Sequence, residues 1–238
     1  MSPPSNGQAR EIESDLRFAP LFSALPDSAL EQCSNAARPC QYASGECLYR
    51  EDESADSLYI IRQGRVKITR SSAEGKELIL GFFGRGDFVG CCCMLDQARL
   101  PCTAQAVEPT TALRIARADF LKLAGTYPPL AMGALQEVTR MLRGAHHKLQ
   151  DLALNPVDKR IVTTLLDLDQ RFGADSLQGA RVIRCRITRQ ELAQLSGTTL
   201  ESASRAMSKL KRAGWIRSSR RGIVLVSPPA LERCLTQP

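Results

Sequence analysis

Residues 187–213 carry side chains whose types and spacing suit hydrogen bonding to the edges of base pairs. Glu201, Ser204, Arg205 and Ser208 share one face of a helix if this stretch is helical, and they gather near its N-terminal end. An arginine donates two hydrogen bonds to guanine O6 and N7, a glutamate accepts one from cytosine N4, and a serine contacts a base edge or a phosphate. The pattern predicts a helix that reads duplex DNA in the major groove.

Two short helices must position these side chains, and the sequence marks where each begins. Thr188 and Glu191 lie three residues apart, as do Thr198 and Glu201, and this spacing predicts a capping box at the start of each helix. Gly197 lies between the two helices, and the second is expected to end at residue 213, before another glycine. The arrangement is typical of a helix-turn-helix.

The second helix should have an inward apolar face and a basic end. Leu200, Ala203, Met207 and Leu210 are expected to pack inward, whereas the lysines and the arginine at 209, 211 and 212 suit phosphates. Residues 215–217 and 223–226 then predict a β-hairpin wing with a basic tip. The alternative is an ordinary helix pair with a hairpin. The expected DNA contacts are Thr188, Arg189, Thr198, Thr199, Glu201, Ser202, Ser204, Arg205, Lys209 and Arg220.

The charge of the chain is unevenly distributed. Residues 155–238 carry 15 Lys and Arg against 7 Asp and Glu, a net charge of +8, whereas residues 1–154 carry 17 against 18. A basic C-terminal third on a near-neutral remainder favours a separate nucleic-acid-binding domain. Solvated surface charge is the alternative.

Composition excludes several classes of protein. With 43% apolar and 24% charged residues, the chain can bury a core. It contains no apolar run of the roughly 20 residues that a membrane span needs, and its first residues lack the basic start and apolar stretch of a secretory signal. We therefore expect a cytoplasmic protein with no membrane partner. No catalytic triad, nucleotide-binding loop or carboxylate pair in a catalytic context is present, so an enzyme is not expected.

The segments that precede the basic C-terminal third differ in composition and in the pattern of their apolar residues. Residues 1–20 are polar and contain proline, which predicts a flexible arm, and residues 26–37 are typical of a short helix. From 45 to 115, short β-branched and aromatic runs alternate with glycine-containing turns. Strands at this spacing predict an antiparallel roll or barrel.

Residues 128–154 predict a long helix with a heptad seam. Apolar residues from Ala131 to Leu152 recur at alternating intervals of four and three, and Asn155-Pro156 then ends the helix. Such a narrow stripe favours pairing with a second copy in a parallel homodimer, although a helix packed on its own domain is the alternative. The expected dimer contacts are Leu135, Val138, Leu142, Ala145 and Leu149.

Nine cysteines and two histidines are the candidate ligands or redox groups. The number of cysteines is odd and no secretory signal precedes them, so a disulfide framework is not expected. Cys33, Cys40 and Cys47 are spaced seven apart, and His146 with His147 lies in the long helix; these five are the candidate metal ligands. Structural roles in the core or on the surface are the alternatives.

The chain resembles the CRP/FNR superfamily of bacterial transcription regulators from about residue 21 to 226. The match is most specific at residues 187–193 and at Glu201-Ser202-Ala203-Ser204-Arg205, which fits the Glu-x-x-Ser-Arg pattern of the FNR-like branch. The cyclic-AMP receptor branch has an arginine before this glutamate, whereas Leu200 stands here. The resemblance implies a palindromic operator of the type TTGAT-N4-ATCAA, with RNA polymerase as an expected protein partner.

The resemblance also implies the architecture, an α+β protein in four parts. A flexible arm (1–20) precedes a sensor domain (21–127) that is a double-stranded β-helix, also called a jelly roll, of the cyclic-nucleotide-binding type. A dimerisation helix (128–154) and a winged helix-turn-helix (155–238) follow.

The sensor residues depart from both well-known branches. Cys91 follows Phe88-Val89-Gly90 where cyclic-AMP binders have glutamate, and Leu100-Pro101 stand where they have the Arg-Ser pair for the cyclic phosphate. A buried anion without a partner is costly, so cyclic AMP is not the expected ligand.

The cysteines at the effector position leave the signal open. FNR holds an iron–sulfur cluster through an N-terminal cysteine group, but residues 1–32 contain no cysteine, and residues 101–107 are similar to the haem-associated DNR-like branch. Cys91, Cys92, Cys93 and Cys102 are therefore the effector or cofactor candidates for a redox, gas or metal-cofactor signal, with haem or an iron–sulfur cluster as the possible group. A cyclic-nucleotide-responsive regulator and a thiol-based redox protein are the alternatives.

Overall fold

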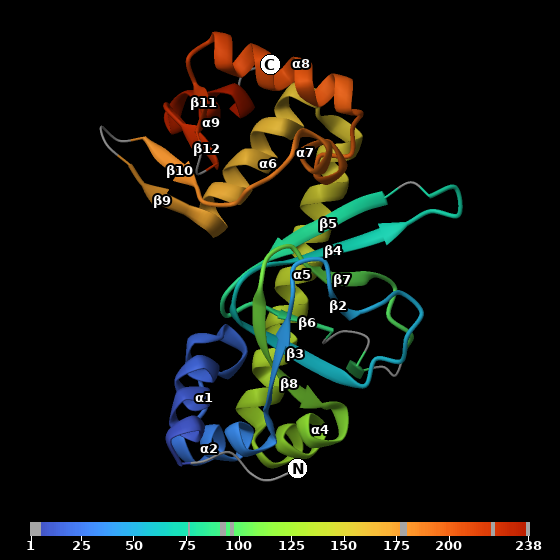
Figure 1. The fold of residues 1–238 in the computed structure, drawn as a ribbon, viewed down its shortest axis with the longest axis vertical. Coiled ribbons are helices and arrows are strands. Elements are labelled where there is room, and N and C mark those ends of the chain that lie inside the picture. The colour runs from blue at the N-terminus through green and yellow to red at the C-terminus, as the bar shows by residue number, and fades with distance from the viewer. Residues whose placement is uncertain are drawn as a thin grey trace. The chain divides into compact units, whose positions relative to one another are not determined.

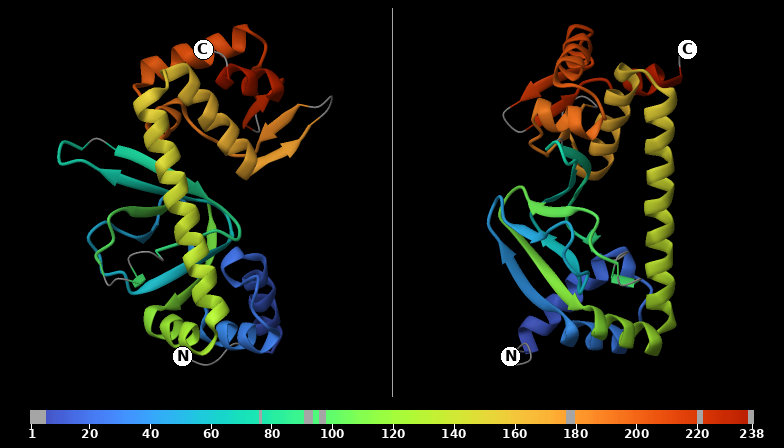
Figure 2. Two further views of the ribbon diagram at one scale, coloured as in Figure 1. Left: turned by 180° about the vertical axis from the view of Figure 1, so that it is seen from behind. Right: turned by 90° about the vertical axis from the view of Figure 1, so that its right-hand side faces the viewer.

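The computed structural model describes residues 6–75, 77–90, 94–95, 98–176, 180–219 and 222–236. These form two compact units, residues 1–144 and 145–238, which are described separately. The division falls inside the helix α5 (Pro128–Leu154), which occupies the range that the heptad spacing predicts. Figure 2 shows α5 as one unbroken helix.

The first unit is built on two antiparallel four-stranded sheets that form the predicted roll (Figure 1). Its interior holds apolar side chains of alternating strand positions, such as Leu58, Ile60, Val66 and Leu113. The first sheet has the order β1 (Arg38–Tyr42), β8 (Thr110–Ala116), β3 (Ser57–Gln63) and β6 (Phe88–Val89). The second has the order β2 (Cys47–Tyr49), β7 (Thr103–Ala106), β4 (Val66–Ser71) and β5 (Glu77–Phe83).

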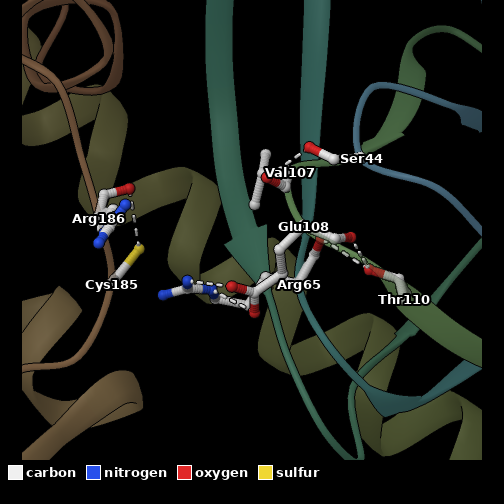
Figure 3. A network of polar contacts seen from close by, with 7 residues as sticks. All are labelled: Ser44, Arg65, Val107, Glu108, Thr110, Cys185 and Arg186. Carbon is white, nitrogen blue, oxygen red and sulfur yellow. Dashed lines mark hydrogen bonds and ion pairs between the residues drawn. The ribbon is translucent and has the colours of Figure 1, made fainter.

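A two-pronged ion pair fastens one end of the roll (Figure 3). Arg65 lies in the turn between β3 and β4, and its Nε and Nη2 donate to Glu108 Oε1 and Oε2 at 3.0 and 2.6 Å. The Thr110 hydroxyl donates to the Glu108 carbonyl at 2.8 Å, and the Ser44 hydroxyl donates to the Val107 carbonyl at 3.1 Å. The Arg65–Glu108 pair holds the turn between β7 and β8 against the turn between β3 and β4, and the Ser44 bond joins the turn between β1 and β2 to the same place.

The prediction of a flexible N-terminal arm over residues 1–20 is wrong for residues 6–18. Residues Asn6–Phe18 form the helix α1, and its Ile12 and Leu16 are buried in the core of the first unit. The Arg62 guanidinium holds α1 on the roll through Asp15, with Nε and Oδ2 2.6 Å apart. Burial and this ion pair explain why a largely polar segment is ordered.

The first unit also contains the start of α5, up to residue 144, and further helical segments. These include η1 (Pro20–Phe22), α2 (Asp27–Ala36) and α4 (Arg117–Thr126). Leu130 and Ala134 of α5 are buried in the same core as the roll. A Cβ at Gly133 would lie 2.5 Å from the carbonyl oxygen of Leu21, so only glycine permits this approach of α5 to the chain.

The second unit combines helices with a small antiparallel sheet. It includes α6 (Val157–Phe172), which starts directly after the Asn155-Pro156 break that ends α5 as predicted. The sheet has the order β11 (Ile216–Ser219), β12 (Gly222–Leu225), β10 (Arg181–Ile183) and β9 (Gly173–Asp175), and α9 (Pro228–Thr236) ends the described chain. The core of this unit is formed by side chains such as Ile161, Leu165, Met207 and Leu231.

None of the helices among the described residues is both long enough and apolar enough to cross a membrane.

Candidate nucleic-acid interface

Helix α7 (Arg189–Leu195) begins at the predicted capping box. The backbone N–H of Glu191 donates to the Thr188 hydroxyl at 3.0 Å, and the backbone N–H of Thr188 donates to Glu191 Oε2 at 2.8 Å. Both halves of the box are therefore present. The Ser196 hydroxyl then anchors the end of α7 in the core by donating to Thr164 Oγ1 of α6 at 2.9 Å.

Helix α8 (Leu200–Arg212) starts one residue later than the second predicted capping box implies. Thr199, and not Thr198, is the N-cap, and its hydroxyl accepts from the backbone N–H of Ser202 at 3.2 Å. Ser202 thus occupies the third helical position that the prediction gave to Glu201. The predicted box of Thr198 and Glu201 is wrong, because adjacent threonines offer two caps and the chain uses the second.

The inward face of α8 is confirmed except at its first residue. Ala203, Ala206, Met207 and Leu210 are buried, whereas Leu200 is 41% exposed, so its expected inward packing is wrong. Leu200 lies in the first turn, where the helix extends past the core that buries the later residues.

The outward face of α8 carries the predicted hydrogen-bonding groups. Glu201, Arg205 and Ser208 are exposed, and Ser204 is half-buried. The backbone N–H of Glu201, then the Thr199 hydroxyl, lowers the pKa of the Glu201 carboxyl, which keeps it ionised as an acceptor. Arg205 Nη2 donates to Ser202 Oγ at 3.3 Å, so the guanidinium lies along the helix surface beside Glu201.

The described candidates for DNA contacts lie at the start of α7, in the turn before α8 and along α8. Of the ten candidates, nine are described, and none of those nine is buried. Arg189 Nη1 donates to the Ser204 carbonyl at 3.4 Å and so links α7 to α8. Arg220 lies outside the described residues. The wing strands β11 and β12 are present as predicted, and Arg217 on β11 is exposed.

Sequence reasoning missed a carboxylate on this surface. Lys209 Nζ lies 2.6 Å from Asp158 Oδ2, which belongs to the first turn of α6. The hydrogen bond to Asp158 raises the pKa of Lys209. These two side chains line a hollow of about 440 Å³ together with Ser204, Arg205, Ser208 and Arg212. Because α6 and α8 are separate elements, the sequence carries no local signal for this contact.

The heptad seam on α5 is largely exposed in the single chain. Leu135, Leu142 and Leu149 are 58%, 54% and 65% exposed, Ala145 is exposed and Val138 is half-buried. The residues of α5 that pack on the first unit, Leu130, Ala134 and Glu137, are different ones. The seam residues are therefore apolar side chains that the single chain leaves largely uncovered.

The C-terminal end of α5 contacts the helix-turn-helix directly. A Cβ at Gly197, in the turn between α7 and α8, would lie 2.5 Å from Leu152 Cδ2. Lys148 Nζ donates to the carbonyl oxygen of Leu195, the last residue of α7. Desolvation by burial lowers the pKa of Lys148. This lysine also escaped sequence reasoning, because the heptad pattern assigns no role to the polar positions of the helix.

The sensor candidates are only partly described. Cys91, Cys92 and Cys93 lie outside the described residues, and Cys102 is half-buried against the core of the roll. Leu100 is buried in that core, and the neighbouring Arg99 is exposed and donates to the Asp52 carbonyl at 2.6 Å. The buried, apolar Leu100 thus stands where cyclic-AMP binders are expected to have the arginine that binds the cyclic phosphate.

The described candidate metal ligands do not form a site. Cys33 is buried on α2, where desolvation raises the pKa of its thiol to about 11. Cys40 lies on β1, where burial also raises the thiol pKa, and Cys47 lies on β2 of the other sheet. His146 and His147 are exposed on α5. No three His, Cys, Asp or Glu side chains of the described chain could hold a metal ion together, because a spacing of seven distributes the cysteines over three elements.

Comparison with known families identifies two matching domains. Residues 39–127 match the model of the cyclic nucleotide-binding domain, and residues 159–234 match the Crp-like helix-turn-helix domain. The first match covers the roll, and the second covers the helices and the hairpin described above.

Known proteins are similar over most of the chain. The "CRP-like cAMP-activated global transcriptional regulator" of Mycobacterium tuberculosis is 28% identical over 92% of this chain and 97% of its own length. The "Nitrogen fixation regulation protein FixK" of Bradyrhizobium diazoefficiens is 28% identical over 91% of this chain and 90% of its own. The solved structure of FixK2 from Bradyrhizobium japonicum superposes with a TM-score of 0.73 at 27% identity, covering 83% of this chain and 96% of that one.

Proposed function

The chain belongs to the CRP/FNR superfamily of DNA-binding transcription regulators, and from this premise we propose that it acts as a homodimer on an FNR-like palindrome, TTGAT-N4-ATCAA. With chromosomal DNA as its partner it would act in the cytoplasm, where RNA polymerase is its expected protein partner. The observation that carries the operator is the outward face of α8, where an ionised Glu201 lies beside an exposed Arg205. These groups match the acceptor and donor edges of base pairs in the major groove.

The exposed seam of α5 supports the dimer. An exposed stripe of leucines on a long helix is costly in water and is covered when two such helices pair in parallel. Pairing would bring two recognition helices to half-sites about one helical turn, roughly 34 Å, apart. Dimerisation therefore suits the palindromic operator.

For the signal we propose a redox, gas or metal-cofactor input to the roll. The buried Leu100 supports this choice over a cyclic nucleotide, because it offers no charge to a buried cyclic phosphate. A cyclic nucleotide is the second candidate, because residues 39–127 match the cyclic nucleotide-binding domain and a similar regulator is named as cAMP-activated. Either input would act by shifting the population of dimers that are competent to bind DNA.

Binding assays test the operator. Full-length protein should retard a duplex that contains TTGAT-N4-ATCAA at concentrations where a scrambled duplex of equal length remains free. Equal binding to both duplexes at physiological salt would contradict the proposed specificity.

Two measurements test the signal. Calorimetric titration with cyclic AMP and cyclic GMP should show no binding, and binding of either would favour the second candidate. The optical spectrum of protein purified without oxygen addresses the cofactor, since a Soret band would indicate haem and broad visible absorbance an iron–sulfur cluster. The described thiols at residues 33 and 40, with their raised pKa values, do not fit such a group, so we propose no ligand among them.

A further inference from the structure

We propose that Asp158 limits the affinity of the protein for DNA by occupying Lys209, a phosphate-binding candidate of the recognition helix. The inference rests on the proposed DNA-binding role of α8 and adds a residue that the family comparison does not assign. In the free protein, Lys209 Nζ lies 2.6 Å from Asp158 Oδ2. A DNA phosphate must displace this carboxylate before it can use the full charge of the lysine.

The position of Asp158 places its charge at the surface that meets DNA. It lies in the first turn of α6, and it lines the same hollow as Arg205 and Lys209. Among the described residues that line this hollow it is the one carboxylate, and the others are serines and cations. By pairing with Lys209, a carboxylate here cancels one of the cations that would attract the DNA backbone.

The pair is well placed to act as a restraint that DNA can release. The side chains of Lys209 and Asp158 are 69% and 46% exposed, and exposed ion pairs are weak. The lysine can therefore exchange the carboxylate for a phosphate without unfolding of α8, whose inward face is held by Ala203, Met207 and Leu210.

Removal of the carboxylate tests the restraint. Asp158→Asn should bind duplex DNA about 3- to 10-fold more tightly at low salt, on palindromic and scrambled sequences alike. Because a released lysine displaces one further counterion per subunit, the plot of log affinity against log salt should steepen by about 1 to 2 units for a dimer. A merely structural role for Asp158 would not steepen this salt dependence.

Two companion variants separate the role of Lys209 from a general change of charge. Asp175→Asn removes a carboxylate of the same unit that pairs with Arg181 at 2.8 Å and does not line the hollow, so it should leave DNA binding near the wild-type value. Asp158→Asn combined with Lys209→Gln should abolish most of the gain seen in Asp158→Asn alone.

Each other outcome overturns the proposal. A double variant that keeps the whole gain would mean that Asp158 repels DNA directly and not through Lys209. Unchanged or weaker binding by Asp158→Asn, with an unchanged melting temperature, would mean that the pair has no restraining role. The operator proposal fails separately, if wild-type protein binds palindromic and scrambled duplexes equally. The effect of Asp158→Asn can still be measured in that case, because it is expected on both duplexes.

Discussion

Charged side chains are used differently in the two units of the chain. In the first unit, cations on the roll are matched by nearby carboxylates, as in the pairs of Arg62 with Asp15 and of Arg65 with Glu108. Residues 155–238 contain 15 cations and only 7 carboxylates, so this segment carries a surplus of positive charge.

Two arginines illustrate the contrast. The side chain of Arg65 is 12% exposed and binds Glu108 with two prongs, which makes it part of the fold of the roll. Arg205 is exposed and makes one long hydrogen bond to a serine hydroxyl, so its remaining donors can reach a ligand. The comparison indicates that Arg65 serves the fold of the roll, whereas Arg205 keeps donors available for the polyanion that we propose as its ligand.

Leu142→Glu should have the largest effect, because it places two carboxylates in the proposed seam between subunits. Loss of two buried leucines costs about 3–6 kcal/mol, which raises the dimer dissociation constant roughly 10²- to 10⁴-fold. Sedimentation velocity measures the change. Leu80→Glu is the matched control on β5 of the roll, since Leu80 is 53% exposed and Leu142 54%. Equal effects of the two substitutions would contradict a dimer formed through α5.

Arg205→Ala should abolish specific operator binding and leave the dimer folded. A bidentate contact to guanine contributes about 1–3 kcal/mol to discrimination, and a dimer loses two of them, so operator affinity should fall by at least about 30-fold. Fluorescence anisotropy with labelled operator measures this loss. Arg70→Ala, at an exposed arginine of the roll that pairs with Glu51, should bind the operator normally. A variant at Arg205 that footprints the operator like the wild type would refute the assigned role.

The sequence predicts the recognition helix better than the sensor, because the contacts that define this helix join residues that are close together in the chain. The capping box of Thr188 and Glu191, the buried face of α8 and the break at Pro156 depend on residues close in the chain, and the structure confirms them. The start of α8 is shifted by one residue because Thr198 and Thr199 are equivalent locally.

Features that depend on distant residues could not be predicted in this way. Helix α1 is ordered by Arg62, which is 47 residues from its partner Asp15. The pairing of Asp158 with Lys209 spans 51 residues. The equal spacing of Cys33, Cys40 and Cys47 suggested a shared metal site. Equal spacing along the chain does not bring side chains together, because these residues lie on three different elements, α2, β1 and β2.

Glu108→Gln should weaken the roll and leave DNA binding unchanged. The neutral amide loses the charge of the two-pronged contact with the largely buried Arg65, which should cost about 1–2 kcal/mol of stability. Thermal unfolding of the full-length protein measures the loss, and anisotropy on the operator measures binding. Glu51→Gln, whose partner Arg70 is 63% exposed at 3.5 Å, should lower stability by less than about 0.5 kcal/mol. If folded Glu108→Gln bound the operator more weakly than the wild type, the charge pairs of the roll would also affect DNA binding. That result would contradict a purely structural role for them.

Lys148→Met should have the smallest effect and one that depends on pH. Burial lowers the pKa of Lys148 below its ordinary value of 10.5, so the folded protein binds fewer protons there than the unfolded chain as pH approaches 10.5 from below. The stability of the wild type relative to Lys148→Met should therefore rise with pH over that alkaline range.

Urea unfolding of both proteins at pH 8 and at about pH 10 measures this difference, with Lys122→Met as the control at an exposed lysine of α4. The neutral amine still donates to the Leu195 carbonyl at the end of α7, so the contact survives deprotonation while the desolvation cost of the charge disappears. A relative stability that falls with pH would mean that the lysine is retained for its charge, as a cation at the C-terminus of α7. In that case Lys148 would be a structural cation, like Arg62 and Arg65 of the roll. Structural cations would then occur in both units, including the contact of α5 with the end of α7.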